Sequence, residues 1–507
     1  MKPLKIVLLS AEISPYSKSG GLADVARSLP RSLFRLGHKV VVITPYYGCV
    51  KRKGWPLENM HQKLTLEFAG RSCKFGFKKI ISPDNYPVIF VCQEELFGSR
   101  FGQQRRLYGP WYDNGLRFYL FDLAVIEIIK ILKLRPDVLH CHDWHTGLIP
   151  NLLKMKYKDD PELARTSTLF TIHNLGFQGP KDWWKVHPDL ADDGRGLPPE
   201  DPEKIEYVNF AKRAILHADI INTVSERYAR EILTPEYGCQ LDPYLRAREK
   251  DVYGIINGVD YTVFNPQFDE NVYLNYDTDS LEKKVKNKVI LQKNFGLEED
   301  PDAPLIGLAN RLTEQKGFEL IINLLDWLLK IGFQVAIVGS GGGIYADFFR
   351  KMSRKNPKKL LFCSPFREEI ARKIYAASDI YLMPSRWEPC GISQLISLRY
   401  GAIPVVHSVG GLSDTVSNYN PATGRGNGFV FTSYNSTDLL IAIVRALENY
   451  RRPGAWRKLV RRAMKESYSW RLPAKKYVAL YRKAIRKHKK KKNLKSKNLK
   501  SKIHVLG

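Results

Sequence analysis

The fold is decided by residues 5–30, KIVLLSAEISPYSKSGGLADVARSLP. The opening apolar run predicts a buried strand, and apolar residues at helical spacing from Leu22 onward predict a helix. Gly20 and Gly21 lie at the turn between them, where glycine lets backbone N–H groups approach a ligand. Together with the positive end of the helix and the charge of Lys18, this turn indicates a phosphate site.

The turn matches no standard nucleotide-binding pattern, since it is neither G-x-G-x-x-G nor G-x-x-x-x-G-K-[ST]. An ordinary strand–helix turn with a surface lysine therefore stays open as the alternative. A related stretch, GGLSDTV at 410–416, resembles GGLADV at 20–25 and also opens a helix-like run after a strand-like run. Two such helix starts are consistent with one cleft lined from opposite sides.

Strand-like runs alternate with helical patterns in two separate series. The first begins at residue 4 and includes KVVVITP, NYPVIFVC, PDVLHCHD, STLFTIHN and ADIINTVS. The second begins after residue 300 and includes PLIGLANRL, QVAIVGSGG, KLLFCS, DIYLMPS, IPVVHS and GFVF. Alternation of this kind predicts two α/β domains, each with a parallel sheet covered by helices. Ligands of such sheets bind at the carboxyl ends of the strands.

The composition is that of a globular protein. The 507 residues are 44% hydrophobic and 26% charged, which suits two or three domains. The seven cysteines form no C-x-x-C pair, which favours reduced thiols in the cytoplasm over a disulfide framework. No apolar run reaches ~18 residues and no cleavable signal pattern is present, so we expect neither a membrane span nor secretion.

The sequence ends in a strongly basic, low-complexity stretch. Residues 482–507 carry twelve lysines and arginines, and no acidic residue follows Glu466. Such a self-repelling stretch predicts disorder. Two interpretations stay open, namely a solvated tail, which we favour, and a tail that binds nucleic acid, an anionic surface or an acidic partner.

Polar residues rich in potential metal ligands end one strand-like run, HCHDWH at 140–145. A zinc site needs three or four converging ligands, and no second cluster in the sequence supplies them. We therefore favour a polar wall at the sheet edge over a metal site, with Asp143 as a candidate for contacting substrate hydroxyls. In TIHN at 171–174, His173 and Asn174 follow the next strand, although a histidine here is as often a satisfied core residue.

Charged side chains follow two strands of the second series. Arg311 and Lys316 in NRLTEQKG suit a diphosphate, and Glu388 in SRWEPCGISQ brings a carboxylate to the same kind of strand end. When a sugar–diphosphate bond breaks, negative charge develops on the leaving diphosphate, and fixed cations stabilise it. No acidic D-x-D pair lies near these loops to hold a metal. The pattern predicts metal-independent glycosyl transfer, with ordinary surface turns as the alternative.

In combination these motifs resemble the bacterial glycogen synthases and plant starch synthases. The resemblance covers nearly the whole chain and rests on the order of KSGGLADV, YDNGLRF, HCHDWHTGL, FTIHNLGFQG, TVSERYAREI, INGVD, NRLTEQKG, SRWEPCGISQL and GGLSDTV. It implies an α/β protein with the GT-B glycosyltransferase fold, in which two Rossmann-like domains face an inter-domain cleft and close over it. It also implies retaining transfer of glucose from ADP-glucose to the non-reducing end of an α-1,4-glucan primer, without metal or cofactor.

The resemblance further implies a role for each matching residue. The residues matched to catalysis are Asp143, His173, Arg311, Lys316 and Glu388. The residues matched to substrate binding are Lys18, Gly20, Gly21, Asn257, Phe366, Cys390, Gly391, Gly410 and Gly411. In this assignment Arg311 and Lys316 hold the diphosphate, and Glu388 binds the transferred glucose. Phe366 stacks on the base.

The two strand series, the basic tail and the resemblance together predict the domain boundaries. The N-terminal Rossmann-like domain would comprise 1–258, followed by a linker at 259–300. The C-terminal nucleotide-sugar-binding domain would comprise 301–464. A helix at 465–485 would return to the N-terminal domain, and 486–507 would form the basic disordered tail.

Several positions depart from the family's pattern. The family's K-T-G-G-L is K-S-G-G-L here, so Ser19 keeps a hydroxyl. The family's V-R-x-T-G-G-L is VHSVGGL, so His407 replaces an arginine and Val409 a threonine. Trp111 stands where a tyrosine is common, and the Pro-rich region 180–206 is altered. A titratable cation and a missing hydroxyl near the phosphates predict a changed donor affinity.

Three alternatives follow from these comparisons. Other retaining GT-B families often carry E-x7-E, but the second position counted from Glu388 is Ile396, which favours the glucan synthases. UDP-glucose is the alternative donor. A non-catalytic glucan-binding scaffold is motivated by the altered VHSVGGL loop. It is opposed by four intact residues, Lys18, Arg311, Lys316 and Glu388.

Overall fold

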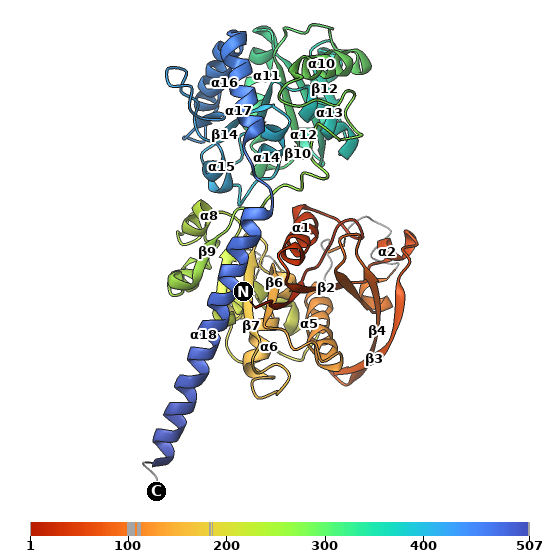
Figure 1. The fold of residues 1–507 in the computed structure, drawn as a ribbon, viewed down its shortest axis with the longest axis vertical. Coiled ribbons are helices and arrows are strands. Elements are labelled where there is room, and N and C mark those ends of the chain that lie inside the picture. The colour runs from red at the N-terminus through yellow and green to blue at the C-terminus, as the bar shows by residue number, and fades with distance from the viewer. Residues whose placement is uncertain (1, 99–106, 109–112, 182–183, 185, 505–507) are drawn as a thin grey trace. The chain divides into compact units, whose positions relative to one another are not determined.

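The two strand series form two separate sheets. The computed structural model describes residues 2–98, 107–108, 113–181, 184 and 186–504. The chain divides into two units (Figure 1). Unit 1 comprises Met1–Val224, Ala229–Ile255 and Trp470–Gly507, and unit 2 comprises Ser225–Tyr228 and Ile256–Ser469. The predicted pair of α/β domains is therefore confirmed.

Unit 1 contains a nine-stranded sheet with the order β3-β4-β5-β2-β1-β6-β7-β8-β9. Among the strands that the structure describes in this unit, only the β3–β4 and β4–β5 pairs are antiparallel. The chain runs outward from β1 to β2 on one side and to β6 on the other, so the order reverses at β1, where α/β sheets bind ligands. The strands are β1 (Lys5–Leu9), β2 (Lys39–Pro45), β3 (Glu58–Phe68), β4 (Arg71–Ile81), β5 (Pro87–Cys92), β6 (Val138–His142), β7 (Ser167–Ile172), β8 (Ile220–Thr223) and β9 (Val252–Gly254).

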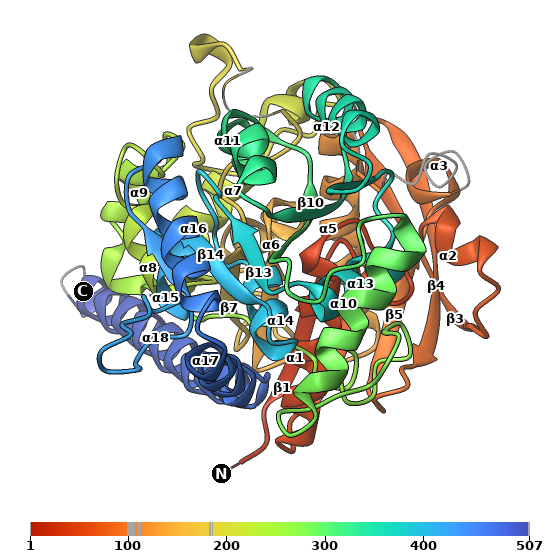
Figure 2. The same ribbon diagram turned by 90° about the horizontal axis from the view of Figure 1, so that it is seen from above.

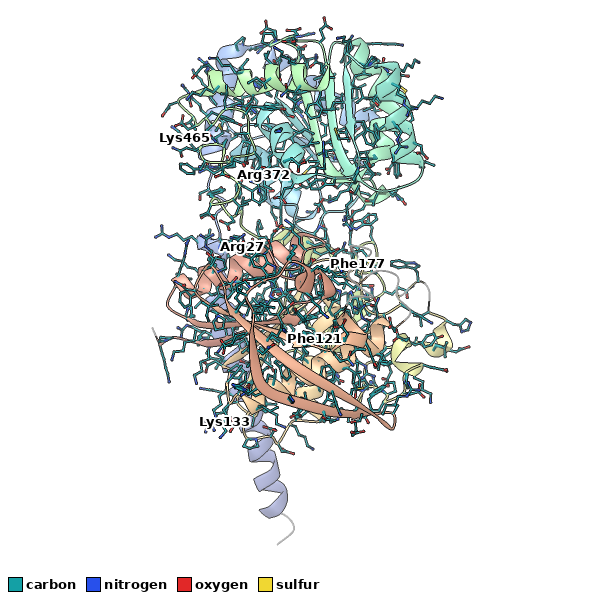
Figure 3. All side chains as sticks on the ribbon, turned by 90° about the vertical axis from the view of Figure 1, so that its right-hand side faces the viewer. Arg27, Phe121, Lys133, Phe177, Arg372 and Lys465 are labelled. Atoms are coloured by element: carbon teal, nitrogen blue, oxygen red, sulfur yellow. The ribbon has the colours of Figure 1, made fainter. Side chains whose placement is uncertain are left out.

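Helices cover this sheet because its parallel strands are apolar on both faces. Phe121 on α5 lies in the interior of unit 1, whereas Lys133, just beyond that helix, lies at the surface (Figure 3). The helices are α1 (Gly21–Arg35), α2 (Gly48–Arg52), α3 (Glu94–Phe97), α5 (Asn114–Ile131), α6 (Ile149–Met155), α7 (Phe210–His217), α9 (Asp242–Arg246) and α18 (Arg471–His504), while α8 (Glu226–Glu231) is divided between the units.

Unit 2 contains a six-stranded parallel sheet with the order β12-β11-β10-β13-β14-β15. Its strands lie at the centre with helices around them (Figure 2). The order reverses between β10 and β13, which pair directly through Ile306 and Ile380. The strands are β10 (Leu305–Arg311), β11 (Gln334–Ser340), β12 (Leu360–Cys363), β13 (Ile380–Met383), β14 (Ile403–His407) and β15 (Phe429–Phe431). The helices are α10 (Leu281–Phe295), α11 (Phe318–Lys330), α12 (Ile344–Lys355), α13 (Glu368–Ala377), α14 (Ser393–Arg399), α15 (Gly410–Thr415), α16 (Ser436–Tyr450) and α17 (Pro453–Lys465).

The stretch interpreted as a linker, 259–300, is part of unit 2. Two of its lysines are buried on α10, which packs on α13. Lys284 Nζ donates to the carbonyls of Ala376 (2.9 Å) and Ser378 (2.8 Å), and burial lowers its pKa to about 7. Lys288 Nζ lies 2.8 Å from the carboxylate of Asp379. The sequence predicts that the second domain begins at residue 301, whereas unit 2 includes the chain from Ile256 onward.

Helix α18 returns to unit 1 and is tied to the sheet by a buried polar network. His140 Nε2 lies 2.6 Å from Thr171 Oγ1, which in turn donates to Asn222 Oδ1. The threonine hydroxyl donates its one hydrogen to the amide oxygen, so it can only accept from His140. The proton of His140 therefore lies on Nε2. Its Nδ1 then accepts from the Tyr481 hydroxyl at 2.8 Å, and burial keeps the imidazole neutral by lowering its pKa.

The same helix continues well past the predicted start of the tail (Figure 1). It begins at Arg471 and ends at His504, so residues 486–504 are helical where the sequence predicts disorder. After Pro473 this helix contains no glycine or proline, and lysine, leucine and alanine all have high helix propensity. Among the described helices, none has the length and apolar character needed to cross a membrane.

Candidate active site

The glycine turn after β1 encloses a buried carboxylate that sequence reasoning missed. Glu12 is fully buried and accepts hydrogen bonds from the amides of Ser19 and, at 3.2 Å, Gly20. Helix α1 begins at Gly21 as predicted, with Gly20 extended at its N-cap. The amides of Ser19 and Gly20 therefore face Glu12, whereas the sequence predicts that this turn offers its amides to a ligand. The only hint in the sequence is a lone acid at the end of an apolar run.

The charge of this turn is balanced locally. Burial is the largest effect on Glu12 and raises its pKa to about 7, against the hydrogen bonds from Ser19, the Tyr108 hydroxyl and Gly20. Lys18 Nζ lies 2.9 Å from Asp24, in an ion pair whose side chains are one third or more exposed. The predicted phosphate contact of Lys18 would therefore replace a weak surface pair.

We expect Glu12→Gln to change the pH dependence of stability. Because the folded pKa lies above the usual 4.5, protonation of Glu12 stabilises the folded chain, and this stabilisation is lost as pH rises through about 7. Glutamine cannot ionise, so the variant does not lose this stability. Relative to the wild type, its free energy of unfolding should therefore rise by about 2 kcal/mol between pH 5 and pH 8. Urea titrations at both pH values measure this difference. The matched control is Glu58→Gln, at an exposed site. Its free energy of unfolding should differ from that of the wild type by the same amount at both pH values. The same pH-independent difference for Glu12→Gln would contradict the prediction.

The ends of β6 and β7 bring together two predicted catalytic residues. The carboxylate of Asp143 accepts the amide of His173 at 2.7 Å and that of Asn174, and burial raises its pKa to about 7. The rings of His142 and His173 meet at 2.9 Å between Nδ1 and Nε2. Burial lowers the pKa of His173 to about 3, which keeps its imidazole neutral.

The backbone at Asp143 is strained. Its φ of +56° with ψ of 179° is a region that residues other than glycine rarely adopt. Strain of this kind costs about 1–3 kcal/mol and persists where the surroundings over-determine it. Here the carboxylate is held by two amides of the next strand end. The position of the carboxylate at the sheet edge is thus fixed by both its backbone and its hydrogen bonds.

In unit 2 the predicted site residues converge on one ion pair. Lys316 Nζ lies 2.5 Å from Glu388 Oε2, and both side chains are nearly buried. The Ser385 hydroxyl also donates to this carboxylate at 3.1 Å. Lys316 precedes Gly317, whose φ of +71° and closeness to the Pro384 carbonyl leave no room for a side chain. The pairing of β10 with β13 brings these two loops side by side.

The E-P-C-G loop lies directly against the second glycine turn. The amide of Gly411 donates to the Glu388 carbonyl at 3.1 Å. A Cβ added at Gly410 would overlap the Glu388 carbonyl oxygen, and one at Gly411 would overlap that of Cys390. Gly391 has a φ of +69°. The two loops therefore depend on glycine where they touch, which explains why the motif needs these residues.

Asn257 belongs to the same cluster in unit 2. Its amide and side chain hydrogen-bond the Cys390 thiol, whose pKa burial raises to about 12. Its Oδ1 is buried and has no partner within the described part of the chain. An orphaned buried acceptor beside the E-P-C-G loop suits a ligand hydroxyl.

Arg311 and Phe366 lie at other strand ends of unit 2. Arg311 ends β10 with an exposed side chain, and Phe366 follows β12 with 42% of its surface exposed. The Phe366 amide donates to Ser340 Oγ at 2.7 Å, which fixes its backbone. Neither side chain is hydrogen-bonded to the Lys316–Glu388 cluster among the described residues. Trp111 lies outside the described residues.

Metal ligation finds no support in the geometry that is described. Within residues 2–98, 107–108, 113–181, 184 and 186–504, no three His, Cys, Asp or Glu side chains converge as metal ligands do. His140, His142 and His173 are instead hydrogen-bonded to neighbouring side chains.

Comparison with known proteins identifies the family. Residues 5–247 match the family described as starch synthase catalytic domain, and residues 290–470 match glycosyl transferases group 1. The glycogen synthase of Thermosipho melanesiensis is 42% identical over 491 residues, which cover 96% of this chain and 100% of that protein. The glycogen synthase of Moorella thermoacetica is 42% identical over 493 residues, covering 96% and 98%.

A solved structure agrees with this match. The catalytic domain of starch synthase IV from Arabidopsis thaliana, bound to ADP and acarbose, superposes with a TM-score of 0.85 at 30% identity, covering 96% of this chain and 100% of that one. Sucrose-phosphate synthase from Thermosynechococcus elongatus, at 17% identity and a TM-score of 0.56, shares the fold alone. With its two α/β units and its E-P-C-G and glycine loops in contact, the chain belongs to the glycogen and starch synthase family of GT-B glucosyltransferases.

Proposed function

We propose that this protein transfers glucose from ADP-glucose to the non-reducing end of an α-1,4-glucan, with retention of configuration at the anomeric carbon. The observation that carries the proposal is the Lys316–Glu388 ion pair, whose Nζ and Oε2 atoms lie 2.5 Å apart. The loops around this pair touch other backbone segments at Gly317, Gly410 and Gly411, where a side chain would not fit. Full-length similarity to glycogen synthases supports the glucan product. Similarity to a starch synthase bound to ADP supports the adenine nucleotide.

In this proposal Lys316 pairs with the diphosphate when the donor is bound, and with Glu388 when it is not. Cleavage of the bond between glucose C1 and the β-phosphate oxygen leaves negative charge on the diphosphate, which Lys316 and Arg311 stabilise. Glu388 then accepts hydrogen bonds from hydroxyls of the transferred glucose, beside the amides of Cys390 and Gly391. The acceptor hydroxyl of the glucan passes its proton to the leaving diphosphate oxygen as its own oxygen bonds to C1. The reaction needs no metal or cofactor, because side-chain cations neutralise the leaving group.

Other residues are assigned to the substrates. We assign Asp143, His173 and Asn257 to the glucose, and the exposed ring of Phe366 to stacking on the base. Lys18 with the Gly20–Gly21 turn, and the Gly410–Gly411 turn, are assigned to the donor.

The donor base and the cellular location belong to the same proposal. A stacking ring accepts either base, so UDP-glucose is the competing donor. A cytoplasmic location is supported by the seven cysteines, which are all free thiols. A non-catalytic scaffold is disfavoured because a scaffold gains nothing from a nearly buried lysine–glutamate pair, which is costly to desolvate.

The proposal is tested with purified full-length protein, glycogen, and radiolabelled ADP-glucose or UDP-glucose in buffer with EDTA. We expect label in the precipitated glucan, released by α-amylase, with ADP-glucose used at least tenfold better. A reaction without glycogen measures background. Label from neither donor, in folded protein that still binds glycogen, would support the scaffold instead. A requirement for added divalent metal would contradict the assigned roles of Lys316 and Arg311.

A further inference from the structure

Gln394 lies at the start of α14, directly beside the turn that carries Cys390 and Gly391. Its side chain is fully buried. Nε2 donates to the carbonyl of Cys390 and to the carbonyl of Gly391, each at 3.1 Å. The amide oxygen Oε1 has no hydrogen-bond partner among the described residues. The opposite orientation of this amide would set its oxygen against two carbonyl oxygens, so the nitrogen must face these carbonyls.

The same side chain also contacts the second glycine turn. Gln394 Nε2 lies 3.1 Å from Thr415 Oγ1, and the Thr415 hydroxyl donates to the Gly411 carbonyl at 2.6 Å. On the other side, a Cβ added to Gly391 would lie 2.3 Å from Gln394 Oε1, so the backbone of Gly391 rests on the glutamine amide. One buried amide therefore fills the space between the E-P-C-G turn and α15.

We infer that Gln394 is a positioning residue, whose amide holds the carbonyls of Cys390 and Gly391 and thereby aims the N–H groups of the same two peptide bonds. Both bonds are trans, and in a trans peptide the C=O and the N–H point in opposite directions. The N–H groups of Gly391 and Ile392 therefore point away from Gln394. Neither has an acceptor within the part of the chain that the structure describes. The inference rests on the proposed function, in which amides of this turn lie beside the transferred glucose.

Removal of the glutamine donor should turn this part of the backbone. Cys390 and Gly391 are buried, and a buried carbonyl without a donor is costly. The two peptides would rotate toward other donors, and each N–H would turn with its carbonyl. Misplacement of a group by about 1 Å near a reacting centre can cost ~10²-fold in rate. The effect of Gln394 on catalysis is thus indirect, through the direction of the backbone N–H groups.

The first test replaces Gln394 with methionine, which has a similar length and no hydrogen to donate. We expect kcat with ADP-glucose and glycogen to fall at least about tenfold, at a temperature where the variant is folded. The matched control is Gln292→Met. Gln292 is also fully buried in unit 2 and donates to a backbone carbonyl, that of Asp300 at 2.7 Å, so its loss should lower stability but change kcat less than about twofold. A kcat for Gln394→Met within about threefold of wild type would overturn the inference.

A second variant, Gln394→Glu, gives a readout that packing alone would not move. A protonated carboxyl group keeps one donor for the two carbonyls, whereas a carboxylate has none and repels both oxygens. Burial favours the protonated form. The ratio of its kcat to that of the wild type at the same pH should therefore fall at least about fivefold between pH 6 and pH 8.5, while the ratio for Gln394→Met stays constant. A ratio for Gln394→Glu that does not change with pH would overturn the inference.

A measurement without turnover separates this inference from the proposed function. The Cys390 thiol is only 5% exposed, so its reaction with iodoacetamide reports movement of the turn. Peptide mass spectrometry should show faster labelling of Cys390 in Gln394→Met than in the wild type or in Gln292→Met, with Cys363 of the same unit unchanged. Equal labelling of Cys390 in all three proteins would overturn the inference whether or not the protein is active. An inactive wild type with faster labelling in Gln394→Met would support the inference and contradict the proposed function.

Discussion

Replacing Glu388 with glutamine should lower kcat about 10³-fold while the chain stays folded. The carboxylate is nearly buried and pairs with Lys316 at 2.5 Å. Glutamine has the same shape and keeps an acceptor for Lys316 and Ser385, so the loop persists. It removes the negative charge that pairs with Lys316 and that the proposed function assigns to accepting the glucose hydroxyls. Loss of a preorganised charge at a reacting centre typically costs about 10²–10³ in rate.

The control for this variant is Glu314→Gln. Glu314 lies on the short helical turn that ends at Lys316, but its side chain is 59% exposed and pairs with Arg386. Its loss should change kcat less than about twofold, since exposed pairs contribute little. Initial rates with ADP-glucose and glycogen measure both variants, and melting temperatures check the fold. A kcat for Glu388→Gln within tenfold of wild type would remove this carboxylate from the mechanism.

The sequence predicts where the charged loops begin, but it does not predict that they meet. Arg311 ends one strand and Lys316 lies just beyond it, and Glu388 follows another strand, 72 positions after Lys316. Alternating strands and helices indicate a parallel sheet without specifying the strand order. Only the observed pairing of β10 with β13 places Lys316 beside Glu388. The residue types are thus readable from local sequence, while their ion pair is a property of topology.

Local sequence patterns also give the wrong burial for charged residues whose hydrogen bonds come from tertiary contacts. Lys284 and Lys288 look like part of a charged linker, yet both are buried because carbonyls and Asp379 accept their hydrogen bonds. Glu12 looks like the end of a strand, yet it folds back to bind the turn that follows it. In each case a charged residue is bound by backbone groups that no spacing rule connects with it. Predictions that treat charge as exposure fail at such positions.

Replacing Gly411 with alanine should lower kcat/KM at least ~10²-fold and destabilise unit 2 by about 3 kcal/mol. The added Cβ would overlap the carbonyl of Cys390, so one of the two loops must move. Movement would also break the hydrogen bond from the Gly411 amide to the Glu388 carbonyl. Because Gly411 lies in α15 with helical backbone, alanine is not strained there, and the effect isolates the collision.

The matched substitution is Gly454→Ala in α17. This glycine has open space around its Cβ position, so alanine should leave kcat unchanged and stabilise the helix by up to about 1 kcal/mol. Urea unfolding and initial rates measure both variants. Equal behaviour of the two alanines would mean that the E-P-C-G loop does not depend on its contact with the glycine turn. A loss of stability at Gly411 with full activity would show that the contact supports the fold alone. A loss of both stability and activity would show that the contact with Gly411 positions the Glu388 loop.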